Sequence, residues 1–384
     1  MHVLHVVPTY LPAVRYGGPI HSVHGLCVAL AARGHDVEVF TTNVDGPRDS
    51  DVPLGVPVDL DGVKVSYFSS RRLRRLYWSL PMARMLKQAV GNFDLVHLHS
   101  VFLWPTWAAA RAARSARVPY VVSPRGMLVK DLFRARSRVL KSAWMALIER
   151  TNLAHAAGIH VTSAVEAAEL AAFGYALKGR VFEVPNGVSL SAPLPVEPVT
   201  APSYVLMLGR INWKKRIDIA LETVQRVDGI RLLIAGGDEE RLAATLRARA
   251  ASLEVAERVE FVGPVEGLRK RQLLRGALAL LMPSLSENFG NSAVEAMAEG
   301  TPVIVGPQVG VADSVKESGA GFVVAPTGEA FADAVGQLQA DPKLRAGMSE
   351  RARALVAANY AWSVIGARME NEYRVILNDL RMTA

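Results

Sequence analysis

Cysteine, long apolar runs and a secretory leader are scarce or missing in this 384-residue sequence. The single cysteine, Cys27, excludes an intramolecular disulfide and a cysteine cluster for zinc. No stretch approaches the roughly 18–20 uninterrupted apolar residues of a membrane-spanning helix. Met1–Pro8 lacks the basic residues and apolar run of a leader and is typical of a first strand. We therefore expect a cytoplasmic protein with Cys27 buried in its core.

Charge is distributed unevenly. Residues 1–195 contain 22 Lys and Arg against 13 Asp and Glu, a net of +9, whereas residues 196–384 contain 22 against 23, a net of −1. Half of all residues are apolar and 21% are charged, as in a globular enzyme. The excess of positive charge predicts that the first half of the chain meets an anionic partner. Nucleic acid is the weaker candidate because no recognition module is present.

Short apolar segments alternate with helical patterns along the whole chain, which predicts parallel, doubly wound α/β sheets. The strands expected in the first half are residues 2–7, 37–42, 63–67, 94–99, 120–123, 158–162 and 180–184. A second series follows at residues 204–208, 231–235, 259–262, 278–282, 303–305 and 322–324.

Two domains are the expectation for a chain of this length. Residues 194–202 hold three prolines with little periodic pattern and are the best candidate for a linker. We therefore expect an N-terminal domain over residues 1–195 and a C-terminal domain over 196–361. A cleft between two such domains is a preferred ligand site.

The segment Ser286–Gly300 holds two glutamates eight positions apart, Glu287 and Glu295. It follows an apolar strand and opens a helix, and in α/β sheets such a helix start binds phosphate. Glu287 is expected in the loop and Glu295 about two turns into the helix, at most roughly 12 Å away. This separation suits a nucleotide-sugar. Its phosphates would lie at the helix start, with one carboxylate at the sugar and the other at the ribose.

The segment resembles the Glu-x7-Glu signature of the family 4 retaining glycosyltransferases, which have the GT-B fold. Phe289, Gly290 and Asn291 lie between the two glutamates, and Glu-Ala-Met-Ala-x-Gly-x-Pro-Val-Ile follows. The resemblance implies that Glu287 contacts the donor sugar as a catalytic residue and that Glu295 holds the ribose hydroxyls. It also implies that backbone N–H groups of the three intervening residues contact the diphosphate. In the GT-B fold two Rossmann-like domains face a cleft, and a C-terminal helix, here about 362–384, crosses back to the N-terminal domain.

Arg210 and Lys215 follow the first strand of the second half. A leaving nucleoside diphosphate gains negative charge as the glycosidic bond breaks, so fixed cations at this point lower the barrier. The sequence around them is similar to the family's Gly-Arg…Lys element, which places both side chains on the diphosphate. Taken alone, the same residues would be read as a solvated basic turn.

Gly17 and Gly18 separate the first strand from the first helix, and glycine lets the backbone approach a ligand closely. They match the family's Gly-Gly loop near the donor phosphates or the acceptor. A plain turn is the alternative, and the dinucleotide fingerprint Gly-x-Gly-x-x-Gly is not present.

His97 and His99 end one strand, and alternation places both rings on one face. They could bind a metal, but the sequence offers no evident third ligand. The family carries a histidine in this region that positions acceptor or sugar, and His99 is the better match. A second family histidine is replaced here by Arg125, which could meet an anionic acceptor.

No metal or cofactor is expected. Asp59-Leu60-Asp61 has the Asp-x-Asp pattern of metal-dependent glycosyltransferases of another fold, but it precedes Gly62, where Asp-Gly is ordinary turn chemistry. Arg210, Lys215 and helix dipoles would supply the positive field that a metal provides elsewhere.

Two basic segments could lie on anionic lipid headgroups. Residues 71–87 contain no acid, and Leu73, Leu76, Tyr77 and Leu80 fall at helical spacing opposite the arginines. Residues 128–141 hold five basic residues against Asp131. The alternative is that both segments are solvated amphipathic helices of the domain.

Together these features predict a retaining glycosyltransferase that moves a sugar from a UDP- or GDP-sugar to a lipid-linked or glycan acceptor. Bacterial exopolysaccharide or lipopolysaccharide synthesis, peripheral to the cytosolic face of the inner membrane, is the expected setting. A nucleotide-sugar epimerase of the same fold and a non-catalytic, membrane-associated subunit that binds nucleotide-sugar are the alternatives.

Overall fold

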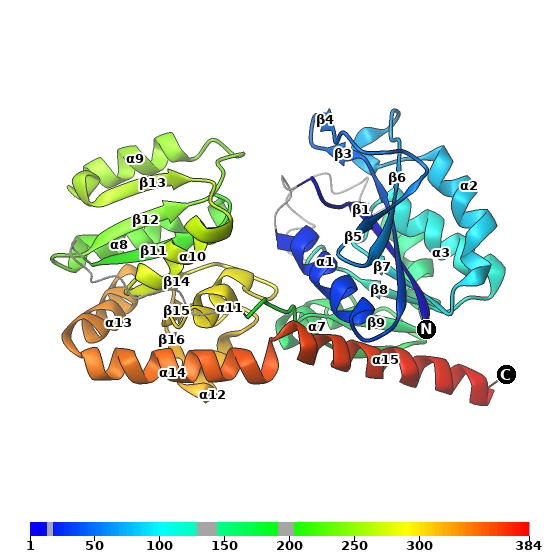
Figure 1. Cartoon of the computed structure of the whole chain (residues 1–384). Coiled ribbons are helices and arrows are strands. Elements are labelled where there is room, and N and C mark those ends of the chain that lie inside the picture. Colours follow the sequence, from blue (N-terminus) through cyan, green and yellow to red (C-terminus); the bar gives the residue numbers. More distant parts are fainter. Residues whose placement is uncertain (14–17, 129–143, 191–202, 384) are drawn as a thin grey trace. The chain divides into compact units, whose positions relative to one another are not determined.

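The computed structural model describes residues 1–13, 18–128, 144–190 and 203–383. The chain forms two compact units, shown in Figure 1. Unit 1 comprises Met1–Gly187 together with Trp362–Ala384, and unit 2 comprises Val188–Ala361. The linker expected over 194–202 and residues 129–141 of the second basic segment lie outside the described residues.

Unit 1 is built on a sheet with the strand order β10–β9–β8–β7–β1–β2–β6–β5. Its strand pairs are parallel, apart from the antiparallel pair of β5 with β6. The strands are β1 (His2–Thr9), β2 (Asp36–Thr42), β5 (Pro57–Leu60), β6 (Val63–Phe68), β7 (Leu95–His99), β8 (Tyr120–Ser123), β9 (Gly158–Val161) and β10 (Arg180–Glu183). A separate two-stranded ribbon pairs β3 (Val44–Asp45) with β4 (Arg48–Asp49). The helices are α1 (Gly18–Ala31), α2 (Leu80–Ala89), α3 (Trp104–Ala116), α6 (Arg150–Ala154) and α7 (Ala164–Ala171), with short helical turns at η1 (Arg74–Leu76), η2 (Val90–Asn92) and η3 (Met145–Glu149).

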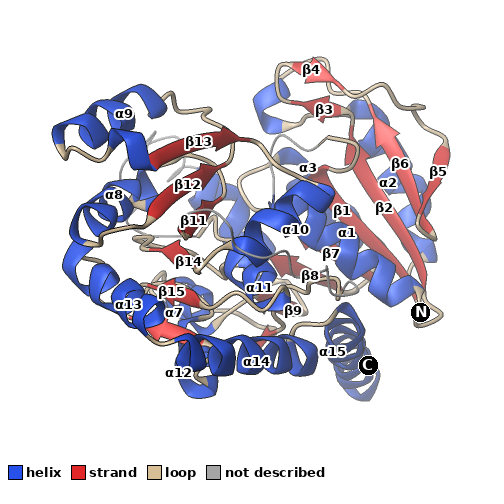
Figure 2. Ribbon diagram, turned by 60° about the vertical axis from the view of Figure 1, so that its left-hand side comes forward, coloured by secondary structure: helices blue, strands red, loops and turns tan. Residues whose placement is uncertain are grey.

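Both faces of this sheet are covered by helices, as Figure 2 shows. Successive residues of a strand point to opposite faces, and the core divides accordingly. Leu4 and Leu98 pack with buried residues of α2 and α3, whereas Val3 and Leu95 pack with those of α1 and of the C-terminal helix. The sheet is therefore doubly wound.

Unit 2 is a smaller parallel sheet with the order β13–β12–β11–β14–β15–β16. Its strands are β11 (Tyr204–Leu208), β12 (Arg231–Ala235), β13 (Val259–Gly263), β14 (Ala279–Met282), β15 (Val303–Val305) and β16 (Gly321–Val323). Its helices are α8 (Ile217–Arg226), α9 (Ala243–Ser252), α10 (Gly267–Gly276), α11 (Asn291–Ala298), α12 (Ala312–Ser318), α13 (Gly328–Ala340) and α14 (Pro342–Asn359), with short turns at η4 (Trp213–Lys215) and η5 (Ala256–Arg258). Val205 and Leu206 again belong to separate core clusters on the two faces.

The last helix, α15 (Trp362–Thr383), returns to unit 1. Its residues Ile365, Met369, Tyr373 and Ile376 form one apolar stripe, at helical spacing, that packs into the same core cluster as α1. The ring of Trp362 lies so close to Gly25 of α1 that a Cβ there would be 2.2 Å from its Cζ2 atom. Burial of this stripe explains why the final helix belongs to the first unit.

The expected fold class is confirmed: two Rossmann-like α/β halves with parallel sheets, and a C-terminal helix that crosses back. Each strand expected from the apolar segments is present, with ends shifted by no more than a few residues. The short strands β3, β4 and β5 were not expected, because two to four residues carry no readable alternation. Cys27 is fully buried in the core.

One expectation about the first basic segment is wrong. Leu73 and Tyr77 have left-handed backbone conformations that flank η1, so residues 73–80 do not form a continuous helix with one apolar face. The helix α2 begins only at Leu80, after the Ser79 side chain accepts a hydrogen bond from the Met82 N–H. None of the described helices is long and apolar enough to cross a lipid bilayer.

The Asp-x-Asp pattern at residues 59–61 forms a turn. The Asp59 carboxylate accepts a hydrogen bond from the Gly62 N–H at 3.2 Å, and Asp61 has a φ of 56°. The Asp61 carboxylate lies 2.9 Å from Nε2 of His24. Both acidic groups are thus used locally, as the turn interpretation predicts.

Candidate active site

The carboxyl end of β11 carries the two predicted phosphate-binding cations. Gly209 has a φ of 135°, a conformation that side chains rarely adopt. A Cβ at Gly236, which directly follows the neighbouring strand β12, would lie 1.9 Å from the Gly209 carbonyl oxygen. These close-packed glycines bring Arg210 to the edge of the sheet, where it is exposed and forms no ion pair with any described residue. Lys215 follows in η4.

Glu287 lies in the loop that follows β14 and faces Lys215. Its carboxylate Oε2 is 2.6 Å from the Lys215 Nζ, and the two side chains are 27% and 20% exposed. The loop is fixed by backbone hydrogen bonds from Glu287 N–H to the Gln308 carbonyl at 3.1 Å and from Gly310 N–H to the Glu287 carbonyl at 2.8 Å. A third, from Leu285 N–H to the Lys214 carbonyl at 2.9 Å, ties it to η4. The structure therefore brings both predicted groups to one edge.

The helix α11 starts directly after this loop. Gly290 has a φ of 104°, and the buried ring of Phe289 packs edge-on against Tyr360 with centroids 5.7 Å apart. The first N–H groups of a helix have no carbonyl partner within it, so the start at Asn291 directs donors toward the sheet edge. Phe289 thus anchors the turn, and Gly290 allows the chain to enter the helix.

Glu295 is the fifth residue of α11, about one turn into the helix and not two as expected. The sequence suggested an earlier start, but the left-handed Gly290 delays it. The Glu295 carboxylate Oε1 lies 3.0 Å from the Nζ atom of Lys270 on α10, and both side chains are 31% exposed. Each signature glutamate therefore has its own lysine partner.

Two further residues of this site were missed in the sequence. Ser284 lines a small cavity together with Arg210 and Lys215. Its hydroxyl is buried and has no hydrogen-bond partner among the described residues. Its position just after a predicted strand could have indicated from the sequence that Ser284 belongs to the site. Lys270 carried no signal, because only folding brings α10 beside Glu295.

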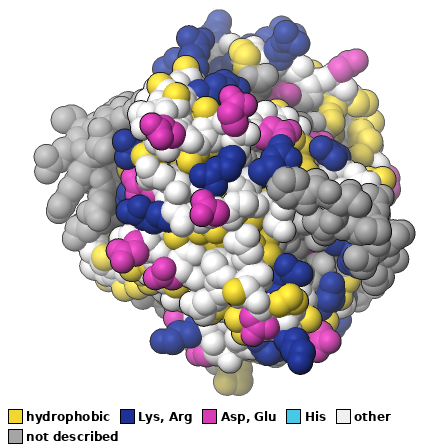
Figure 3. All heavy atoms as spheres, turned by 90° about the vertical axis from the view of Figure 1, so that its left-hand side faces the viewer, with side chains coloured by type: hydrophobic (Ala, Val, Ile, Leu, Met, Phe, Trp, Pro, Cys, Tyr) yellow, Lys and Arg dark blue, Asp and Glu magenta, His cyan; other side chains and the backbone are white. Residues whose placement is uncertain are grey.

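On the side of α8 and α13, basic and acidic side chains are interspersed (Figure 3). This agrees with the near-zero net charge of the second half of the sequence. This face of unit 2 is therefore not a general basic surface.

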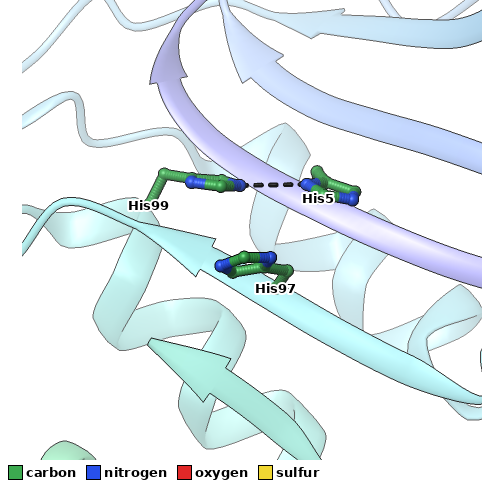
Figure 4. Close-up of side chains that lie close together, drawn as sticks. All are labelled: His5, His97 and His99. Carbon is green, nitrogen blue, oxygen red and sulfur yellow. Dashed lines mark hydrogen bonds between the residues drawn. The ribbon is translucent and has the colours of Figure 1, made fainter. Parts of the chain in front are cut away.

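Unit 1 contains a buried cluster of histidines at its sheet. His97 and His99 project from the same face of β7 with ring centroids 4.3 Å apart, as their spacing predicts. His5 of β1 joins them, with its Nδ1 atom 2.9 Å from the Nε2 atom of His99, and a dashed line in Figure 4 marks this hydrogen bond. Burial and the nearby Arg125 hold the pKa of His99 well below its ordinary value, and they lower that of His5 to about 3.

Geometrically, one nitrogen each from His5, His97 and His99 could approach a common metal ion. In the structure both nitrogens of His97 and of His99 have other partners, whereas only Nδ1 of His5 does and its Nε2 has none among the described residues. His97 Nδ1 is 2.5 Å from the Tyr373 hydroxyl, and its Nε2 is 2.6 Å from the Ser123 hydroxyl. Arg125 is a further unfavourable neighbour for a cation. The hydrogen-bonded cluster therefore suits neutral imidazoles better than a metal, and the absence of a metal stays a prediction.

Arg125 follows β8, and its guanidinium lies among these groups. Nη1 donates to the Asn186 side-chain oxygen at 2.6 Å, and Nη2 lies 3.4 Å from His99 Nδ1. Of the predicted glycine pair, Gly18 is the exposed first residue of α1, and Gly17 lies outside the described residues. The structure thus joins His99 to Arg125 in unit 1 and Lys215 to Glu287 in unit 2, where Arg210 lines a small cavity beside Lys215.

Comparison with known proteins agrees with this geometry. Residues 17–187 match the model of the glycosyl transferase 4-like domain, and residues 196–355 match that of the glycosyl transferases group 1. A D-inositol 3-phosphate glycosyltransferase of Mycobacteroides abscessus is 31% identical over 92% of this chain and 83% of its own. The chain belongs to the family 4 glycosyltransferases. It is therefore a glycosyltransferase enzyme.

Other relatives and solved structures agree with this assignment. A phosphatidyl-myo-inositol mannosyltransferase of Mycobacterium leprae is 28% identical over 94% of this chain and 93% of its own. Sucrose-phosphate synthase from Thermosynechococcus elongatus superposes with a TM-score of 0.77 at 22% identity, covering 99% of this chain and 100% of that one. HepE of Anabaena, in complex with UDP-glucose, gives 0.72 at 18% identity and covers 98% and 100%. These structures show that the enzyme has the GT-B fold.

Proposed function

We propose that this glycosyltransferase moves a sugar from a UDP- or GDP-sugar to a lipid-linked or glycan acceptor, with retention at the anomeric carbon. The observation that carries the proposal is the convergence of Arg210, Lys215 and Glu287 beside the start of α11, at the carboxyl edge of one parallel sheet. Ligands of open α/β sheets bind at this edge. The UDP-glucose complex of HepE supports a nucleotide-sugar donor.

The donor diphosphate would lie between the two cations and the N–H groups at the start of α11. Breaking the bond between the anomeric carbon and the phosphate oxygen leaves negative charge on the diphosphate. Arg210 and Lys215 would stabilise this charge more strongly in the transition state than in the ground state, which lowers the barrier. Charge neutralisation by the chain itself is the reason that we expect no metal requirement.

Donor binding would rearrange the two acid–lysine pairs. Lys215 would turn from Glu287 to the diphosphate, which frees the Glu287 carboxylate to accept hydrogen bonds from the sugar. Glu295 would accept hydrogen bonds from two ribose hydroxyls, which carboxylate oxygens do well. The acceptor hydroxyl would attack on the face that the diphosphate leaves, and its proton would pass to the departing phosphate oxygen. This route gives retention.

The acceptor would bind unit 1. The names of the curated relatives include D-inositol 3-phosphate and phosphatidyl-myo-inositol, which supports an acceptor that carries phosphate. WaaG, a glycosyltransferase of lipopolysaccharide biosynthesis, superposes with a TM-score of 0.70 at 19% identity, covering 97% of this chain and 99% of its own. We propose the assembly of a bacterial surface polysaccharide as the setting.

Membrane attachment through the segment over residues 71–87 belongs to the same proposal. Leu73 and Leu80 are 65% and 44% exposed. The basic side chains that are exposed around them are Arg71, Arg72, Arg75, Arg84 and Lys87. Exposed leucines among arginines suit an anionic lipid surface. Residues 129–141 cannot be added to this surface, since they lie outside the described residues.

The donor proposal is tested by nucleoside diphosphate release from a panel of UDP-, GDP- and ADP-sugars, with and without a membrane lipid extract. We expect release that requires one donor and the extract. Formation of a free epimer from the donor alone would instead identify an epimerase. Tight donor binding without any release would identify a non-catalytic subunit.

Membrane attachment is tested by co-sedimentation with anionic vesicles at low and high salt. We expect salt-sensitive binding that weakens in the variant Leu73→Ser/Leu80→Ser. The variant Leu268→Ser alters another exposed leucine, 59% exposed on α10, and serves as the control. No binding of the unaltered protein at low salt would remove this part of the proposal.

A further inference from the structure

The Arg125 guanidinium is an unusual charge among the described residues of unit 1. Arg125 has a φ of 55°, a left-handed conformation that is strained for a residue with a side chain. Its backbone turns just after β8, at the carboxyl edge of the sheet. The described contacts use two of the five N–H donors of the guanidinium, one to Asn186 and one to His99. The Nε atom is buried without a partner among the described residues.

No carboxylate of the described residues forms an ion pair with Arg125. Glu166 is the nearby acid, but its two oxygens accept hydrogen bonds from Gly126 N–H at 2.7 Å and from Thr162 N–H and Oγ–H, both at 2.8 Å. Burial lowers the pKa of Arg125, since desolvation disfavours the charged form. A half-buried guanidinium that no carboxylate contacts is costly, and a bound anion would offset this cost.

Hydrogen-bond directions around Arg125 show how it is held. A guanidinium only donates, so His99 Nδ1 is an acceptor, and the proton of His99 is on Nε2. That N–H then donates to His5 Nδ1. His99 is thus a neutral imidazole whose two nitrogens are both engaged and whose ring is 1% exposed. It supports Arg125 and offers no negative charge to it.

A second chain of hydrogen bonds fixes the ring of His97, which lies beside His99. The Val184 carbonyl only accepts, so His160 Nε2 carries the proton, and His160 Nδ1 accepts from the Ser123 hydroxyl. That hydroxyl in turn accepts from His97 Nε2, and His97 Nδ1 accepts from Tyr373. The rings of His97, His99 and His160 are therefore satisfied as neutral groups, whereas the buried Nε2 atom of His5 has no partner among the described residues. None of these rings offers a negative charge that balances the guanidinium.

We propose that Arg125 binds a phosphate group of the acceptor, and that His99 is a positioning residue that holds the guanidinium for it. The proposal rests on the proposed function, because it names the charged group of the acceptor in that reaction. The free N–H donors of a planar guanidinium match phosphate oxygens in a two-point contact. The phosphate can come from a soluble sugar phosphate or from a lipid-linked diphosphate, since both present the same oxygens.

The first test is equilibrium binding of inorganic phosphate and pyrophosphate by titration calorimetry. It uses the variant Arg210→Ala/Lys215→Ala, in which the cations of the donor site are absent. We expect binding in this background and a loss of at least tenfold when Arg125→Gln is added, with partial recovery in Arg125→Lys. Arg117→Gln, at an exposed arginine of the same unit, is the matched control and should have no effect.

The positioning role of His99 has its own readout. In His99→Asn the side-chain oxygen can replace Nδ1 as the acceptor for Arg125, whereas His99→Leu offers none. We expect His99→Leu to weaken phosphate binding about as much as Arg125→Gln, and His99→Asn to restore it, with melting temperatures compared in parallel. Equal phosphate affinity in the two His99 variants overturns the positioning role.

Turnover assays separate the two phosphate sources. With the donor identified, Arg125→Gln should raise the acceptor KM at least tenfold and leave the donor KM unchanged. An effect with a soluble sugar phosphate identifies that source, and an effect only with lipid-linked diphosphate identifies the other. Phosphate binding that is absent, or unchanged in Arg125→Gln, overturns the proposal. Binding that depends on Arg125 in a protein without transfer from any donor preserves the anion site and refutes the proposed function.

Discussion

Lys215 Nζ lies 2.6 Å from Glu287 Oε2, which joins two residues that are 72 positions apart in the sequence. One comes from η4 after β11, and the other from the loop after β14, and these two strands are neighbours in the sheet of unit 2. The pair combines the cation that a leaving diphosphate requires with the carboxylate that the family signature places at the sugar.

Replacing Lys215 by alanine removes the cation and leaves Glu287 without its partner. We expect kcat to fall by about 10²–10³-fold, the range seen when one preorganised electrostatic contact is removed from a transition state. Lys215→Arg should recover part of this loss because it keeps the charge. The measurement is nucleoside diphosphate release under saturating donor.

The neighbouring lysine provides the control for this experiment. Lys214 lies in the same turn, and its carbonyl, not its ammonium group, holds Leu285. Lys214→Ala should therefore retain most of the activity. An equal loss in Lys214→Ala and Lys215→Ala would show that general positive charge, and not the geometry of Lys215, matters.

Ser284→Ala separates binding from stability. The buried hydroxyl has no partner among the described residues, so its removal should change the free energy of unfolding by less than about 1 kcal/mol. Because Ser284 lines the cavity beside Arg210 and Lys215, we expect the donor KM to increase severalfold. Chemical denaturation and donor titration test the two parts. A large loss of stability with an unchanged KM would assign this hydroxyl to the fold alone.

Gly25→Ala tests the contact that holds α15 on unit 1. The new methyl group would collide with the Trp362 ring, so we expect a loss of about 1–3 kcal/mol in the free energy of unfolding. Gly336→Ala in α13 is the matched control, since a Cβ there meets no atom within 4 Å. That change should stabilise its helix by roughly 0.5–1 kcal/mol. Similar effects at both positions would contradict the packing described for Trp362.

Glu370 of α15 gives a pH-dependent prediction. Its carboxylate accepts hydrogen bonds from Arg374 at 2.7 Å and from Arg33 at 2.5 Å, and these contacts lower its pKa to about 2. Since the pKa in the folded state is below the ordinary value of 4.5, the stabilisation is present above about pH 4.5. It is lost as the pH falls toward 2.

The measurement compares the unaltered protein with Glu370→Gln by denaturant unfolding between pH 7 and pH 3. The difference in the free energy of unfolding should be largest at neutral pH and should shrink below about pH 4.5. Glu350→Gln, at an exposed acid of α14 without an ion pair among the described residues, should change stability little. If the difference in the free energy of unfolding between the unaltered protein and Glu370→Gln increased as the pH fell, this prediction would be contradicted.

Much of the fold was readable from the sequence, because apolar strands in a doubly wound sheet are short, separate and bounded by turns. The strands that end at His99 and Ser123 were expected, and so were the strands that precede Arg210 and Glu287. What could not be read was pairing at long range. Nothing in the sequence indicates that Lys270 meets Glu295, or that His5 meets His99.

Local backbone geometry explains the expectations that failed. Periodicity placed Leu73 and Leu80 on one helical face, but the left-handed backbone conformations of Leu73 and Tyr77 prevent a continuous helix there. The start of α11 was expected too early, because the φ of 104° at Gly290 is a tertiary constraint that composition does not show. Short-range patterns record which residues are apolar, whereas helix starts depend on what the adjacent loop contacts.

The most direct test of the central claim is the fate of a labelled sugar. A nucleotide-sugar labelled in its sugar is incubated with the enzyme and membrane lipid extract, and both products are quantified for the unaltered protein, Arg210→Ala and Glu287→Ala. We expect one equivalent of label in the acceptor fraction for each nucleoside diphosphate released, and loss of both products in the two variants. Label that stays on the nucleotide, or transfer that persists in both variants, would contradict the assignment of this site.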